Sequence, residues 1–224
     1  MRKRMMEEIK KKYKEICKLF NENNPSGYSD KELHEVIECV GELPEALKFF
    51  YKKYGKSFSF FQDELMLPNK YPARLNDAYL VFFNENQGIC QAAVKKSDVS
   101  LIDPPVYISV DDNEWNLASD KLSDFMVAMY GYQASIALEY NPEDIFFVSR
   151  EEQKKIEERF TKRPETIKGW IDKKYEILLY GNDNGRIALM DMEGEDDIQM
   201  TYAANSQEEL ERMESLLSDI GEAI

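Results

Sequence analysis

The sequence predicts an α+β fold, in which a mostly antiparallel (mixed) sheet has its helices packed largely on one face. Apolar runs of strand length, rich in β-branched and aromatic residues, occur at 79–83, 89–94 and 106–110 with short breaks between them. A second set of strand patterns follows near the C terminus. Stretches with helical periodicity stand before, between and after the two sets. Short turns favour antiparallel neighbours, and helices outside the runs of strands are typical of this class.

The first predicted helix covers residues 7–21. Ile9, Tyr13 and Ile16 recur at helical spacing, while lysines cover the opposite face. We assign residues 1–28 to an N-terminal helical extension whose lysines meet an acidic body. The alternative is a contact of this basic helix with a membrane surface or nucleic acid. Its apolar stripe is modest and glutamates interrupt its positive charge, so we favour the first interpretation.

Two further helices precede the strands. Ser29 and Glu32 form a capping box, in which the hydroxyl and the carboxylate accept hydrogen bonds from backbone N–H groups at the helix start. This helix is expected to extend to about Val40. Pro44 is suited to the first turn of the next helix, and Gly55 is suited to its end.

A hairpin followed by a third strand forms the centre of the sequence. The polar break between the first two strands ends in Gly88, which accepts a positive φ without steric cost. Pro104 and Pro105 have no backbone N–H, so pairing of the third strand is expected to begin at Val106. Two shorter strand candidates stand upstream, at 58–61 and 65–67.

A long helix is predicted from about Leu122 to Tyr140, with Ser119 or Asp120 as its N-cap. Apolar side chains recur along it so that one face of the helix is expected to be buried. Pro142 ends it, because the residue before a proline is driven out of the helical region.

The C-terminal part contains strand patterns and helices in alternation. The predicted elements are a strand or docking segment at 145–148, a helix at 151–160, strands at 175–180, 186–191 and 198–203, and a helix at 206–220. The Asn-Asp-Asn-Gly sequence that ends at Gly185 predicts a hairpin between the first two of the three strands. Ser206 and Glu209 predict a second capping box.

We expect these C-terminal strands to extend the first sheet, because three strands and one helix make a thin core alone. The predicted main domain therefore covers 29–224. Its core is 29–140, and 141–224 extends that core.

The composition narrows the classes of function. A formal net charge of −14 disfavours direct nucleic-acid binding, because phosphate backbones repel an acidic surface. The three cysteines are few, odd in number and widely spaced, as in reduced cytoplasmic proteins. The basic start lacks the apolar core of a secretory signal, and no apolar run approaches the roughly 20 residues of a membrane span.

Five motifs follow one another between Ser29 and Tyr140. They are Val40-Gly41-Glu42-Leu43-Pro44 before a helix with Phe49, Phe50 and Tyr51; the hairpin; Asp103-Pro104-Pro105-Val106-Tyr107; Trp115; and Leu122-Ser123-Asp124-Phe125-Met126. This order resembles the SUKH superfamily, which includes fungal cell-wall-assembly regulators and many bacterial immunity proteins. Many relatives carry an aromatic residue just after the hairpin glycine, where this chain has Gln91-Ala92-Ala93.

The residue types and their spacing predict no catalytic site, no metal site and no cofactor. His34 is the only histidine, and Cys39 lies five positions on, a spacing that separates side chains on a helix. A hydrolase built on two carboxylates would use Glu85 with Asp103 or Asp111. Loop and turn roles for these residues are the simpler interpretation.

The most interesting exposed candidate is the segment that ends at Trp115. Asp111, Asp112 and Glu114 place three carboxylates beside this large aromatic, which suits a basic protein partner. With Glu85 of the hairpin loop, these are the predicted partner-binding residues. The alternative interpretation is that Trp115 belongs to the core and packs on the long helix.

The resemblance implies a cytoplasmic immunity protein that binds and neutralises a cognate bacterial toxin, such as a nuclease or another basic toxin domain. The mechanism implied is stoichiometric occlusion by a non-catalytic monomer or weak dimer, without nucleic acid, membrane or cofactor. A regulatory protein–protein interaction scaffold, like the fungal relatives, is the alternative function. A hydrolase of unknown type is the third.

Overall fold

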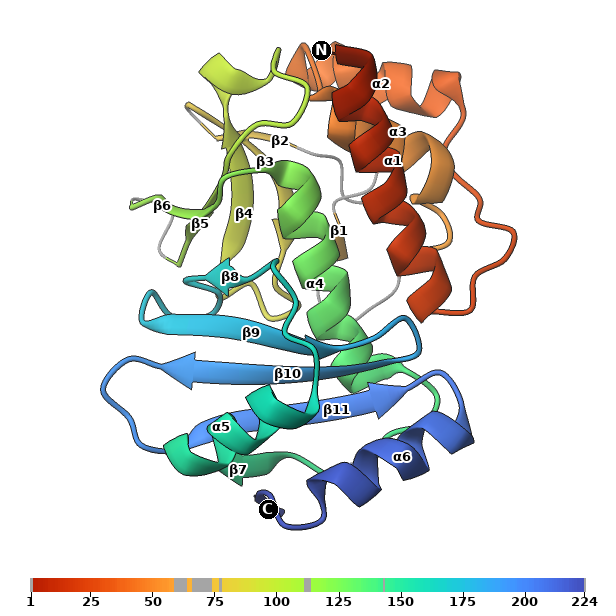
Figure 1. Cartoon of the computed structure of the whole chain (residues 1–224). Coiled ribbons are helices and arrows are strands. Elements are labelled where there is room, and N and C mark those ends of the chain that lie inside the picture. The colour runs from red at the N-terminus through yellow and green to blue at the C-terminus, as the bar shows by residue number, and fades with distance from the viewer. Residues whose placement is uncertain are drawn as a thin grey trace.

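Figure 1 presents the computed structural model, in which two antiparallel sheets lie on either side of one long helix. The structure describes residues 2–58, 64–65, 74–76, 78–110, 114–142 and 144–223. Six helices and the two sheets confirm the predicted α+β class.

Three helices form the N-terminal layer. They are α1 (Arg2–Leu19), α2 (Asp30–Val40) and α3 (Glu45–Tyr54). The predicted capping box at Ser29 and Glu32 is confirmed, and Gly41 ends α2 with a φ of +90°. Pro44 is the N-cap of α3, and Gly55 is its C-cap.

The helix α1 is an integral part of the main core. Ile9, Tyr13 and Ile16 are buried, and the Tyr13 ring meets Phe50 of α3 edge-on at 5.0 Å between ring centroids. Lysines on its other side pair with acidic residues of the body, as in the ion pair between Lys12 and Asp124. The predicted lysine contacts are therefore confirmed, while the helix packs more deeply than an extension does.

The first sheet, which we name sheet A, contains the predicted hairpin. Its strands are β1 (Glu64–Leu65), β2 (Arg74–Asn76), β3 (Tyr79–Asn84), β4 (Gln91–Lys95), β5 (Val106–Ser109) and β6 (Asn116–Ser119). Their order is β1-β3-β4-β5-β6, with β2 also paired to β3, and a short 3-10 turn (Lys96–Asp98) follows β4. Phe58 lies in a buried turn, and the rest of the strand candidate 58–61 lies outside the described residues.

The central helix is α4 (Leu122–Ala137), which is shorter than predicted and buried on nearly every side. Thirteen of its sixteen residues are buried, because α4 contacts α1 and α3 as well as strands of both sheets. The prediction of a single buried face is therefore wrong. A helix sandwiched between two sheets has little surface left for solvent.

The predicted N-cap of α4 is also wrong. Ser119 belongs to β6, and the N-cap position is Lys121, whose side chain makes no capping bond. Asp103 caps the helix from a distant turn instead, by accepting hydrogen bonds from the Ser123 N–H at 2.7 Å and the Ser123 hydroxyl at 2.6 Å.

The C-terminal elements are the strands of the second sheet, sheet B, and the two helices that cover one of its faces. They are β7 (Phe146–Val148), α5 (Arg150–Arg159), β8 (Ile167–Lys168), β9 (Tyr175–Gly181), β10 (Gly185–Met192), β11 (Ile198–Ala204), α6 (Gln207–Leu217) and β12 (Glu222–Ala223). The strand order is β12-β7-β11-β10-β9-β8. Ser206 caps α6 through the Glu209 N–H, while the Glu209 carboxylate binds Arg212.

Sheet B does not extend sheet A, so the prediction of one continuous sheet is wrong. Most residues of β9 and β10 are buried on both faces of the sheet, with α4 on one side and α5 and α6 on the other. In Figure 1 the blue strands cross the lower half of α4, while the yellow and green strands of sheet A lie above them. Because helices pack on both faces of sheet B, this sheet has a larger core than three strands and one helix would form alone.

Candidate partner-binding face

One face of sheet A packs on the helices, and the other is directed away from them. Alternate residues of a strand point to opposite faces, so Leu80 and Phe82 join the main core while Tyr79 and Val81 lie on the outer face. Sheet register places Ala93 beside Val81, and Tyr107 beside Ala93. Apolar side chains therefore run across the outer face over three neighbouring strands.

Three aromatic side chains form what we name the aromatic platform: Tyr79, Tyr107 and Trp115. The Trp115 ring stacks on Tyr79 with centroids 4.4 Å apart and an interplanar angle of 15°. Tyr107 meets Tyr79 at 5.9 Å and 66°. The rings of Tyr79 and Trp115 pack on Val81 and Ala93, which are fully buried beneath them. Leu117 beside Tyr107 is 49% exposed and extends the apolar surface.

The position of Trp115 differs in part from both interpretations, the exposed partner-binding residue and the core residue packed on the long helix. Trp115 is partly buried, but its ring packs on the outer face of sheet A and not on the long helix. The two tyrosines beside it were missed by our sequence reasoning. Their signal was present, because Tyr79 and Val81 alternate with core residues along the first strand.

Charged side chains of both signs border the platform. Glu114 is exposed and pairs with Lys173 at 2.8 Å. The Lys95 ammonium lies 4.3 Å from the centroid of the Tyr107 ring, and its interaction with the Tyr107 side chain raises the pKa of Lys95. Asp111 and Asp112, predicted to bind the partner, lie outside the described residues.

Glu85 occupies a different place and has a structural role. Its side chain is 5% exposed, and one carboxylate oxygen accepts hydrogen bonds from the Gln87 N–H at 2.9 Å and the Ile89 N–H at 3.0 Å. These bonds hold the hairpin loop in place. A carboxylate engaged in this way has little freedom to meet a partner, so we do not include Glu85 in the candidate face.

The other groups considered for catalysis have structural partners as well. Asp103 caps α4, and burial raises the pKa of its carboxyl group. His34 is exposed on α2 and lies 3.2 Å from Glu38. Within the described parts of the chain, no three His, Cys, Asp or Glu residues gather in a way that could hold a metal ion.

Three further findings concern the cysteines, the described helices and the comparison with known proteins. Cys17, Cys39 and Cys90 form no disulfide. Among the described helices, none has the length and apolar character needed to cross a membrane. No protein-family model, curated protein or solved structure matches this chain.

Proposed function

We propose that this protein is a non-catalytic immunity protein, which binds a cognate bacterial toxin and neutralises it by stoichiometric occlusion. The aromatic platform is the proposed contact, and its position on a sheet face directed away from the helices is the observation that carries the proposal. The order of motifs that resembles the SUKH superfamily supports the class of partner.

The platform has the properties of an interface centre. Tryptophan and tyrosine dominate binding energies because they bury a large area with few rotatable bonds. The stacking of Trp115 on Tyr79 holds the ring in place before the partner arrives, which lowers the entropic cost of binding.

Charge provides the second part of the recognition. A net charge of −14 attracts a basic toxin domain over a distance and raises the rate of association. The structural roles of Glu85 and Asp103 support a non-catalytic mechanism, and three cysteines that form no disulfide support a cytoplasmic location.

The first test is co-expression with the product of the adjacent gene. Toxicity of that product alone, rescue by this protein and co-purification of an equimolar complex are the expected results. The affinity of the complex should fall with rising salt, because part of the attraction is between exposed charges. A neighbour that is not toxic and forms no complex would overturn the proposal and favour a regulatory scaffold.

The contact itself is tested with matched variants. Trp115→Ala should weaken the complex by roughly 30-fold or more, which corresponds to the loss of an interface hot spot. Leu101→Ala removes another apolar side chain, 49% exposed but outside the platform, and should leave the affinity unchanged. Equal effects of the two substitutions would place the contact elsewhere.

A further inference from the structure

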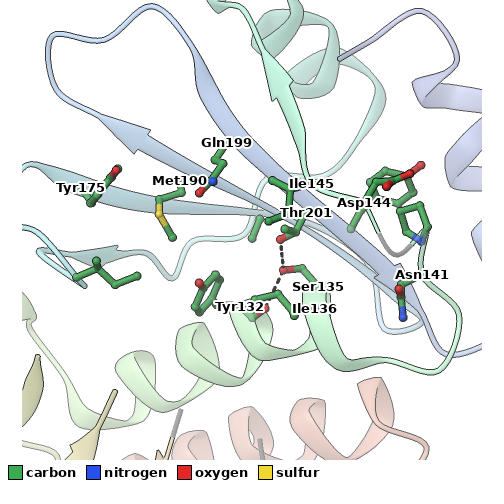
Figure 2. Close-up of a pocket in the computed structure, with 14 residues that line it drawn as sticks. Tyr132, Ser135, Ile136, Asn141, Asp144, Ile145, Tyr175, Met190, Gln199 and Thr201 are labelled. Carbon is green, nitrogen blue, oxygen red and sulfur yellow. Dashed lines mark hydrogen bonds between the residues drawn. The ribbon is translucent and has the colours of Figure 1, made fainter. Parts of the chain in front are cut away.

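A pocket of about 470 Å³ lies between α4 and the strands of sheet B. This volume falls within the range of small-molecule sites. Figure 2 shows Tyr132, Ser135 and Ile136 on the helix side, opposite Met190, Gln199 and Thr201 on the strands. The remaining lining residues are Asn141, Pro142, Asp144, Ile145, Ile171, Tyr175, Ala188 and Tyr202.

The pocket exists because the sheet continues past the helix. Ala134 of α4 and Leu138, the residue just after the helix, pack on Ala203 at one end of β11. Gln199, near the other end of that strand, pairs with Met190 of β10, and both line the open space. The segment after the helix closes the remaining side and includes Ile145, which is 42% exposed.

Two hydrogen bonds determine whether the Thr201 hydroxyl donates or accepts. The Ser135 hydroxyl donates to the Tyr132 carbonyl oxygen at 2.7 Å, and the Ser135 and Thr201 oxygens are also 2.7 Å apart. A hydroxyl has only one proton to donate. Since Ser135 gives its proton to the carbonyl, the donor of the second bond is the Thr201 hydroxyl. Figure 2 marks both bonds with dashed lines.

The Thr201 hydroxyl can therefore only accept a hydrogen bond from a ligand. Its proton is used by Ser135, so its oxygen retains acceptor capacity and no proton to give. The side chain is only partly buried and lines the pocket. A ligand group that binds the Thr201 oxygen must bring an N–H or O–H donor.

The charge of the lining favours a cation. None of the described residues that line the pocket is Lys, Arg or His, and Asp144 is the one carboxylate among them. Two tyrosines, Tyr132 and Tyr175, also contribute to the lining, and aromatic faces attract ammonium groups. An anionic ligand would meet a carboxylate without a compensating positive charge.

We propose that this pocket binds a small organic ammonium compound with an apolar body. The ammonium group donates a hydrogen bond to the Thr201 oxygen, Asp144 provides the opposite charge, and the apolar body contacts Ile136, Ala188 and Met190. This site is separate from the aromatic platform, and its test requires no toxin.

The first experiment uses protein labelled with ¹³C at the methionine methyl groups, observed by NMR. The probe is 2-phenylethylammonium, and 3-phenylpropionate serves as an anion of similar size and shape. The Met190 methyl signal should shift in a saturable manner with the amine only. The Met213 signal, which reports on the core under α6, should stay in place. Equal shifts with the anion, or no shift at Met190, would overturn the proposal.

Two variants then test the named groups. Thr201→Val removes the acceptor with little change in shape, and Asp144→Asn removes the charge at an exposed position. Each should weaken binding of 2-phenylethylammonium about fivefold or more, as expected for one lost hydrogen bond or charge contact. Thr166→Val, on a partly buried threonine outside the pocket, is the control and should bind as the original protein does.

Because Asp144 is exposed, its substitution carries little risk to folding, whatever the effect of Thr201→Val on stability. Thermal unfolding of each variant separates a loss of fold from a loss of binding. Unchanged affinity in folded samples of both Thr201→Val and Asp144→Asn would contradict the assignment.

Discussion

Asp103 and Ser123 are joined by two hydrogen bonds, one to the backbone N–H and one to the hydroxyl, at 2.7 and 2.6 Å. The carboxylate belongs to the turn before β5, and the serine to the first turn of α4. This pair fixes the start of the central helix to sheet A.

We expect Asp103→Ala to lower the free energy of unfolding by about 1–2 kcal/mol, because it leaves the first turn of α4 without its cap. Urea denaturation measures the change. Asp120→Ala, which alters an exposed carboxylate near the same helix start, should have little effect and serves as the control. Equal stability of the Asp103→Ala variant and the original protein would contradict the capping role.

The raised pKa of the Asp103 carboxyl group predicts that the stability of the protein depends on pH. Burial raises the pKa of Asp103 above its ordinary value of 3.8, so the folded state binds this proton more tightly than the unfolded state. Its contribution to stability is therefore largest below 3.8 and declines as the pH rises through the raised pKa. Asp103→Asn does not titrate and should lack this decline. Parallel stability–pH curves for the two proteins would refute the prediction.

Gly27 lies against the backbone of α3. A Cβ atom at this position would stand 2.2 Å from the carbonyl carbon and oxygen of Lys52. We expect Gly27→Ala to lower the free energy of unfolding by about 1–3 kcal/mol, since backbone atoms of a helix move less readily than a side chain. Thermal unfolding measures it, and Asn24→Ala at an exposed site nearby is the matched control. A change within experimental error would show that the loop can move away.

Arg186 is a buried cation that forms no salt bridge within the described parts of the chain, although the carboxylates of Glu165 and Glu15 act on it. Its side chain crosses Gly131 of α4, and its Nε and Nη1 atoms have no hydrogen-bond partner among the described residues. Burial and the neighbouring Arg163 lower the pKa of Arg186 to about 10. We expect Arg186→Met to raise the free energy of unfolding by about 1–3 kcal/mol, because an apolar side chain avoids the desolvation of the charge.

The contrasting variant is Arg163→Met. Arg163 pairs with Glu15 at 2.5 Å, so its removal leaves that carboxylate without its partner and should lower stability. Chemical denaturation of both variants provides the comparison. A loss of stability in Arg186→Met as large as in Arg163→Met would indicate that the buried charge is compensated.

Substitution of Glu85 tests whether its carboxylate acts in folding or in binding of the toxin. Glu85→Ala should lower the free energy of unfolding by about 1–3 kcal/mol, because two backbone N–H groups of the hairpin lose their acceptor. Binding of the toxin by the folded variant should be unchanged. Asn86→Ala, in the same loop and exposed, is the control for stability. Weaker binding without a loss of stability would return Glu85 to the contact surface.

Local sequence patterns determined most of the elements. Capping at Ser29, the hairpin with Gly88, and the three apolar runs of sheet B were predicted, because each depends on neighbours within a few residues. Short strands without such signals, such as β6 and β8, were not predicted, since they form only where another strand lies alongside.

The tertiary structure decided how these elements meet and which side chains are available. It separated the strands into two sheets around α4, gave that helix a cap from Asp103, buried Glu85, and brought Tyr79 to Trp115. The pocket at Thr201 also arises only from the packing of a helix on a longer sheet. Periodicity in the sequence reports which face of an element is apolar, but the partner that covers the face is chosen by contacts between residues far apart in the chain.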